Sequence, residues 1–115
     1  MTTKTKPSDY IAQGWCQNAG AKNADGYVVP VSDGRAACWC LAGALGAARN
    51  DKVINIIQQH RIEDKLDELC KPRLTPATRG QVGTSGSAFV IWNDYVCPDQ
   101  STALKIMQQA EEGIC

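Results

Sequence analysis

Three short motifs, each built around a tryptophan, constrain the fold of this chain more than any other feature. They are GWCQ at residues 14–17, CWCLAGAL at residues 38–45 and IWND at residues 91–94, and they hold all three tryptophans. Each tryptophan stands beside a small, polar or thiol-bearing residue. Because a tryptophan ring brings a large apolar surface into a fold, the motifs predict a compact core with a polar rim.

The composition indicates one domain that covers residues 1–115. The chain has 115 residues, and 43% of them are hydrophobic, which is typical of a globular unit. Its 12 basic and 12 acidic side chains cancel. A nucleic-acid-binding protein usually carries a clear basic excess, so we expect no nucleic-acid partner. Low net charge gives little repulsion between copies, which leaves a homo-oligomer open.

The sequence predicts neither membrane insertion nor export. A membrane-spanning helix needs about 20 apolar residues in a row, and the longest candidate, residues 36–48, is a shorter run rich in Ala and Gly. The polar residues 1–6 are expected to be flexible and do not resemble a signal peptide. We therefore expect a cytoplasmic protein whose six cysteines are reduced, with a disulfide framework as the less favoured alternative.

Hydrophobic periodicity predicts a mainly α (α+β) fold. We expect four to five short helices around a central apolar helix at residues 35–49, and a small β-hairpin near residues 27–31, after the Asp25-Gly26 turn. Trp39 and Leu45 should anchor the core from the central helix. The two glycines of that helix should allow a neighbouring backbone or ring to come close.

The other helices follow from the same patterns. A short helix is predicted at residues 8–13, a short helix or a turn at residues 87–92, and an amphipathic helix at residues 101–112. Two apolar stripes that are out of phase predict a break near residues 60–62 in the helical stretch between them. The first stripe is Val53, Ile56, Ile57 and His60, and the second is Ile62, Leu66 and Leu69.

The stretch from residue 71 to residue 87 is predicted to be a long loop. Residues 70–86 contain two prolines, three glycines and the basic side chains Lys71, Arg73 and Arg79, with no acidic residue. Long loops in compact domains are often functional or mobile.

With these residues in view, the chain resembles a family of small bacterial and phage proteins, domain of unknown function family 6197. The resemblance rests on the order and spacing of Gly14-Trp15 with Gln17, Asp25-Gly26, Trp39-Cys40 leading into Gly43-Ala44-Leu45, Trp92-Asn93-Asp94, and Ser101-Thr102. These motifs span most of the chain. The resemblance implies no known activity, but it implies a phage, prophage or accessory-gene setting.

The cysteines offer two kinds of chemistry. Zinc-binding cysteines usually have about two to four residues between them on a turn, whereas Cys38 and Cys40 fall within the predicted helix and point to opposite sides, so we expect no metal and no cofactor. A cysteine-dependent enzyme is the alternative function, with Cys38 or Cys40 as nucleophile and His60, the only histidine, as base. Asn93 or Asp94 would complete that arrangement. Cysteines inside a helix are usually inert packing residues, which disfavours it.

Ligand contacts are predicted in two places. The glycine-rich residues 80–87 lead into a helix start, where convergent backbone N–H groups attract anions. The predicted contacts there are Arg73, Arg79, Gly83, Thr84 and Ser85. Asn93 and Asp94 form the second place. A solvated loop and a turn-capping motif are the respective alternatives.

Together these observations favour stoichiometric binding over catalysis, because no nucleophile–base or metal set has convincing spacing. We expect a small phage- or mobile-element-type accessory protein that binds a host protein or a small anionic ligand, for instance to counter host defence. Such a protein would act in the cytoplasm of the host cell.

Overall fold

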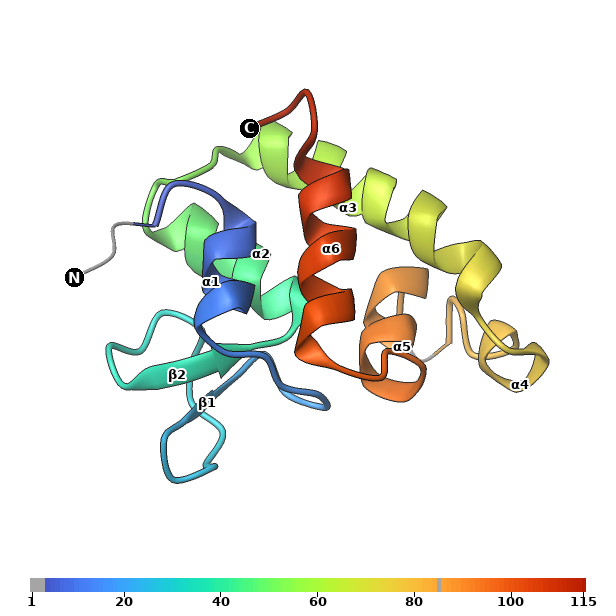
Figure 1. The fold of residues 1–115 in the computed structure, drawn as a ribbon, viewed down its shortest axis with the longest axis horizontal. Coiled ribbons are helices and arrows are strands. Elements are labelled where there is room, and N and C mark those ends of the chain that lie inside the picture. The colour runs from blue at the N-terminus through green and yellow to red at the C-terminus, as the bar shows by residue number, and fades with distance from the viewer. Residues whose placement is uncertain (1–3, 85) are drawn as a thin grey trace.

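The chain folds into a set of short helices, with a small sheet at one end (Figure 1). The computed structural model describes residues 4–84 and 86–115. In chain order the elements are α1 (Pro7–Gln13), β1 (Ala21–Asn23), β2 (Ala36–Trp39), α2 (Leu41–Asn50), α3 (Ile56–Cys70), the 3-10 helix η1 (Lys71–Arg73), α4 (Pro76–Arg79), α5 (Ala88–Tyr95) and α6 (Gln100–Glu111). The predicted mainly α fold with a small antiparallel hairpin is confirmed.

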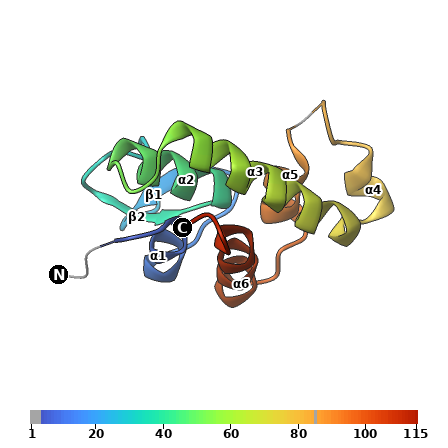
Figure 2. The same cartoon turned by 90° about the horizontal axis from the view of Figure 1, so that it is seen from above.

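The helices lie in two layers. Figure 2 shows α1 and α6 on one side of the molecule and α3 on the other. The helix α1 packs against both α6 and α2, while α3 packs against α5 and α6. Since each of these helices turns an apolar face inward, the core forms between the layers.

The helix α2 is largely buried and packs against α1, α3 and α5, although it is shorter than predicted. Leu41, Ala44, Leu45 and Ala48 of this helix are fully buried. Trp39, which precedes the helix, is 4% exposed. Both predicted anchors, Trp39 and Leu45, are therefore core residues.

The predicted helix at residues 35–49 is wrong in its first third. Residues 36–39 form β2, which pairs with β1 through Ala21 and Trp39 and, on its other side, with Trp15. The N–H group of Trp39 donates to the carbonyl of Gly14 (3.0 Å), and the N–H group of Cys16 donates to the carbonyl of Trp39 (3.2 Å). Partners distant in sequence thus satisfy this backbone, and apolar periodicity over so few residues does not separate strand from helix.

The hairpin also lies elsewhere than predicted. The Asp25-Gly26 turn is present, with Gly26 at φ +86°, but its following strand contributes only a single bridge between Val28 and Lys22. The strand that completes the hairpin is β2. Tyr27 and Val28 are 71% and 70% exposed.

The helix α3 runs without the predicted break. Asn55 caps its start: the side chain of Asn55 accepts from the backbone N–H of Gln58 (2.8 Å), and the side chain of Gln58 accepts from the backbone N–H of Asn55 (2.9 Å). From there the helix continues to Cys70, with Ile62, Leu66 and Cys70 facing the core. Because this second stripe sets the orientation of the helix, the first stripe turns outward, and Ile57 and His60 are exposed.

The terminal helices match their predictions. Pro7 stands in the first turn of α1, and Ala103, Met107 and Ala110 of α6 are fully buried. Of the predicted flexible residues 1–6, the first three lie outside the described residues, while the backbone N–H groups of Thr5 and Lys6 donate to Asp9. None of the helices in residues 4–84 and 86–115 is long and apolar enough to cross a membrane.

Candidate functional site

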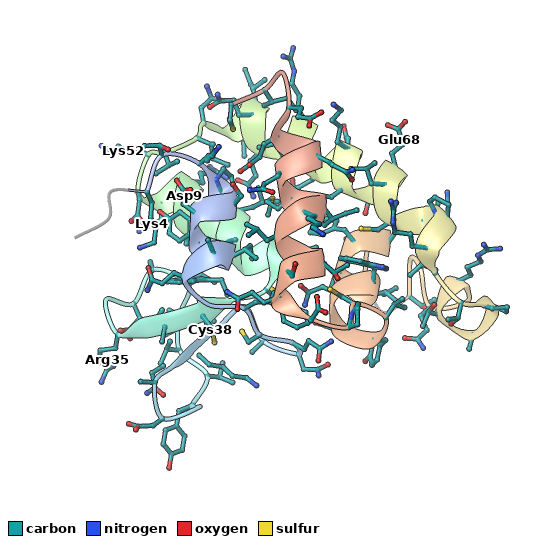
Figure 3. All side chains as sticks on the ribbon, viewed as in Figure 1. Lys4, Asp9, Arg35, Cys38, Lys52 and Glu68 are labelled. Carbon is teal, nitrogen blue, oxygen red and sulfur yellow. The ribbon has the colours of Figure 1, made fainter. Side chains whose placement is uncertain are left out.

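A groove of about 710 Å³ lies where the end of α3 meets η1, α4 and the turn that follows. Its lining residues are Asp67, Glu68, Lys71, Pro72, Leu74, Arg79 and Val82. Three of them are apolar, two are acidic and two are basic. Figure 3 shows Glu68 on α3 toward this end of the molecule. The groove thus combines an apolar surface with charged groups of both signs.

The walls of this groove are folded, although we predicted a long loop over residues 71–87. Pro72 stands at the start of η1, and Leu74 behind it is 4% exposed. Thr75 and Thr78 form a capping box at the start of α4, where Pro76 occupies a first-turn position. Proline is favoured there because the first N–H groups of a helix have no partner inside the helix.

Asp67 ties the groove to the rest of the molecule. Its Oδ1 atom accepts a hydrogen bond from the backbone N–H of Phe89 (3.0 Å), in the first turn of α5. The N-cap residue of that helix, Ser87, makes no capping bond of its own. A carboxylate is well placed here, because the N-terminus of a helix is electropositive.

The predicted arginines have different positions. Arg79 lines the groove together with Lys71. Arg73 is exposed, and its guanidinium donates to the carbonyl of Leu69 near the end of α3, so it caps that helix. The structure therefore separates two side chains that the sequence had grouped.

In the glycine-rich turn, the amides of Gly83 and Thr84 bond to carbonyls of the turn itself. The N–H group of Gly83, a residue at φ +88°, donates to the carbonyl of Gly86 (2.9 Å), and the N–H group of Thr84 donates to Gln81 (3.2 Å). The hydroxyl of Thr84 also donates to the Gln81 carbonyl (3.1 Å). Ser85 lies outside the described residues. Charge at the groove thus comes from side chains.

Asn93 lies inside the protein, 1% exposed, where the three tryptophan motifs meet. Its Oδ1 atom accepts from the indole N–H of Trp15 (2.8 Å) and from the backbone N–H of Leu41 (3.1 Å). Its Nδ2 atom donates to the Cys16 carbonyl (3.3 Å) and to Asp94 (2.9 Å). Because the first N–H groups of a helix need outside acceptors, Asn93 caps α2 from a different helix.

Two neighbours extend this network, which we call the motif hub (Trp15, Gln17, Leu41, Asn93 and Asp94). The Gln17 amide donates to the carbonyls of Asn93 (2.9 Å) and Cys97 (3.2 Å). Asp94 accepts from the backbone N–H of Asn18 (2.9 Å). The GWCQ and IWND motifs thus hold each other in place, and the lining of the groove includes neither Asn93 nor Asp94.

Four residues of this hub, Trp15, Gln17, Asn93 and Asp94, are among those on which the family resemblance rests. The sequence matches the model of the Family of unknown function (DUF6197) over residues 6–112. The chain belongs to this family. A comparison of this chain with curated proteins found no match, and neither did a comparison with solved structures. In this DUF6197 member, the three tryptophan motifs meet at the buried side chain of Asn93.

The thiols of this DUF6197 chain are placed differently from our expectation. Cys38 lies on β2 and Cys40 is the N-cap of α2, where its sulfur accepts from the N–H group of Gly43 (3.2 Å). The two side chains do not sit within one helix. The Cys38 thiol instead neighbours that of Cys16, and burial, followed by this contact, raises the pKa of Cys16 to about 12.

This arrangement disfavours the cysteine-dependent alternative. Burial raises the pKa of Cys40, whereas a nucleophilic cysteine needs a lowered pKa. His60 is exposed on α3, and within residues 4–84 and 86–115 no hydrogen bond joins it to Cys38 or Cys40. In the same part of the chain, no cluster of three His, Cys, Asp or Glu side chains can hold a metal ion.

Sequence reasoning missed most of the groove lining. Asp67 and Glu68 precede the acid-free stretch, and Leu74 and Val82 lie within the supposed loop. One signal was available, because Asp67 and Glu68 stand four and three residues before Lys71, the spacing that places side chains together on a helix.

Proposed function

We propose that this DUF6197 member is a binding protein, and that its groove takes an apolar side chain of a partner protein beside an acidic residue of that partner. The groove itself is the observation that carries this proposal. Binding sites are typically concave and largely apolar, with a few charged groups that fix orientation. Pro72, Leu74 and Val82 offer the apolar part, and Lys71 and Arg79 the positive charge.

A protein partner fits this groove better than a small free anion. Asp67 and Glu68 also line the groove, and their carboxylates oppose a bare anion. The amides of Gly83 and Thr84, which would favour an anion, already donate to protein carbonyls. A peptide with an apolar side chain gains from the floor of the groove, and mixed rim charges then select its register.

The finer part of the proposal concerns the biological setting. The family resemblance to bacterial and phage proteins supports an accessory role for a phage or mobile element, in the cytoplasm of the host, with a host protein as the partner. Counteracting host defence is one form of that role.

Arg79 and Arg73 provide the test. Peptides from a displayed random library are selected on the immobilised protein, and their affinities are measured by fluorescence anisotropy over a range of salt concentrations. Arg79→Ala should weaken binding about tenfold and flatten the salt dependence, since it removes a charge from the groove. Arg73→Ala should bind as the wild type does, because Arg73 caps α3 outside the groove. Equal losses in both variants, or none in either, would remove the groove from consideration.

A further inference from the structure

A second, smaller cavity lies at the other end of the molecule, between α1, β2 and the end of α2. Its volume is about 200 Å³, and it is lined in part by Lys4, Tyr10, Asp33, Trp39 and Asp51. Figure 3 shows Lys4 and Glu68 at opposite ends of the molecule, so this cavity is separate from the groove. The proposed binding of a partner in the groove makes no use of it.

Two aromatic rings form a rigid wall of this cavity. The ring centroids of Tyr10 and Trp39 are 5.3 Å apart, and the rings meet edge to face at 86°. The Tyr10 hydroxyl donates to the carboxylate of Asp51. The indole N–H of Trp39 donates to the Val31 carbonyl (3.2 Å). Because both polar ends are fixed, the faces of the rings stay in place.

An ammonium group already stands against this wall. The Nζ atom of Lys4 lies 5.0 Å from the centroid of the Tyr10 ring and 5.5 Å from that of Trp39. Cations are attracted to the electron-rich faces of aromatic rings at such distances, Trp being the strongest partner. The cavity therefore has the chemistry of a site for an organic cation.

The charges around the cavity agree with this interpretation. Asp33 and Asp51 both line it, and Asp33 also pairs with Arg35 (3.1 Å) on the outside. In the described part of the chain, Lys4 makes no ion pair within 4.0 Å and no hydrogen bond through its ammonium group. Lys4 is therefore held mainly by the ring faces, a contact that a competing cation can replace.

The segment that carries Lys4 is held by few bonds. The backbone N–H groups of Thr5 and Lys6 donate to Asp9 (2.8 and 3.2 Å), as does the Thr5 hydroxyl (3.1 Å), and all three bonds are exposed. Exposed hydrogen bonds open readily, because water replaces the partners. Lys4 precedes the helix α1, which begins at Pro7, so its side chain can leave the cavity while the body of the helix stays folded.

We propose that this cavity is a second binding site, which takes a small alkylammonium ion in the place that Lys4 occupies. Lys4 acts as a built-in competitor, so the affinity of the intact chain is lowered by the fraction of time that Lys4 fills the cavity. Removal of the Lys4 side chain should open the site while the aromatic wall remains.

The test is a titration of nitrogen-15-labelled protein with n-butylammonium chloride, in which the NMR signal of the Trp39 indole N–H is followed. Lys4→Ala should bind about tenfold more tightly than the wild type, since the internal competitor is gone. Lys6→Ala is the matched control, because it removes the same charge from an exposed side chain in the same segment. It should bind as the wild type does.

Three results would overturn the proposal. The first is an unchanged Trp39 indole signal in Lys4→Ala at saturating n-butylammonium. The second is an equal gain in affinity for Lys6→Ala, which would reduce the effect to net charge. The third is an equal response to 1-butanol, which would show a merely apolar cavity.

Discussion

The polar groups of the motif hub are buried or half-buried and hydrogen-bonded to the protein, whereas the basic groups of the groove are exposed. In the hub, Asn93 is 1% exposed, and its amide oxygen and nitrogen bond to four protein groups. At the groove, Lys71 and Arg79 are exposed, and apolar side chains lie next to them. Polar groups that are satisfied inside a protein stabilise its structure, whereas exposed charges beside an apolar surface are available to a partner.

This difference explains why the most distinctive sequence motifs are poor guides to a binding site here. A Trp-Asn-Asp motif invites a ligand-binding interpretation, yet its asparagine joins three segments that are far apart in sequence. The groove, by contrast, is lined by ordinary residues. Mutations should therefore separate the two regions, with large effects on stability in one and on binding in the other.

The largest effect is expected at the hub. Asn93→Ala should lower the free energy of unfolding by about 3–5 kcal/mol, because it leaves the buried N–H group of Leu41 and the part-buried indole N–H of Trp15 without acceptors. Urea unfolding followed by tryptophan fluorescence measures the change. Asp94→Asn is the control, since it keeps an acceptor oxygen for Asn18, and it should stay within about 1 kcal/mol of the wild type. A loss in Asn93→Ala no larger than that of the control would mean that the hub is not structural.

Two glycines of α2 differ in how closely the neighbouring chain packs against them, and their substitution should therefore have different effects on stability. A methyl group on Gly43 would overlap the carbonyl oxygen of Gly20, so Gly43→Ala should destabilise the fold by about 2 kcal/mol or more. At Gly46 the methyl group would lie 3.3 Å from Val31, whose side chain can adjust. There the gain of about 1 kcal/mol in helix propensity offsets the crowding, and Gly46→Ala should stay close to the wild type. Thermal melts of the two variants should be clearly separated; coincident melts would disprove the close backbone contact.

Glu111, a buried polar residue outside the groove, tests whether every buried polar group of this protein stabilises the fold. It is 4% exposed and accepts a hydrogen bond from the N–H group of Ser8 (2.7 Å), but burial raises its pKa above the usual 4.5. Its contribution to stability is thus complete below pH 4.5 and is lost as the pH rises through the raised value. Glu111→Gln resembles the protonated acid, so its stability relative to the wild type should increase from about pH 4 to about pH 7.

Urea unfolding of both proteins across this pH range gives the difference directly. A difference that stays constant, or that falls as the pH rises, would show that the Glu111 carboxylate is not penalised by burial.

The smallest effect on stability is expected at the groove. Arg79→Ala should change the free energy of unfolding by less than about 1 kcal/mol, because the side chain is exposed. A urea unfolding curve checks this, and Arg73→Ala serves for comparison. Unfolding of Arg79→Ala at much lower urea would make the groove a structural element instead of a contact surface.

The sequence predicted the fold class, the first and last helices and the core residues well. Periodic patterns such as Ala103, Met107 and Ala110 in α6 define an inward face. It failed at residues 36–39, where the partners of the strand lie elsewhere in the chain. The predicted helix break near His60 was also wrong. Two apolar stripes were present in the sequence, and in the fold only the second one, through Ile62 and Leu66, packs against the core.

The candidate site was predicted only in part. Of the predicted contacts, Arg79 lines the groove, and so does Lys71, a basic residue of the same acid-free stretch. The apolar floor was not predicted, because Leu74 and Val82 are single residues in a stretch that reads as a loop, and the contacts that gather them are tertiary. Composition located the segment, but only the fold shows which of its side chains face a common groove.

The measurement that tests the account most directly is hydrogen–deuterium exchange with and without a peptide selected on the protein. We predict that the peptide slows exchange across residues 67–84 and leaves residues 14–18 and 91–95 unchanged, because the hub is structural and the groove makes the contact. Slower exchange at residues 14–18 and 91–95, with no change across residues 67–84, would contradict this division and place the contact surface at the Trp-Asn-Asp motif.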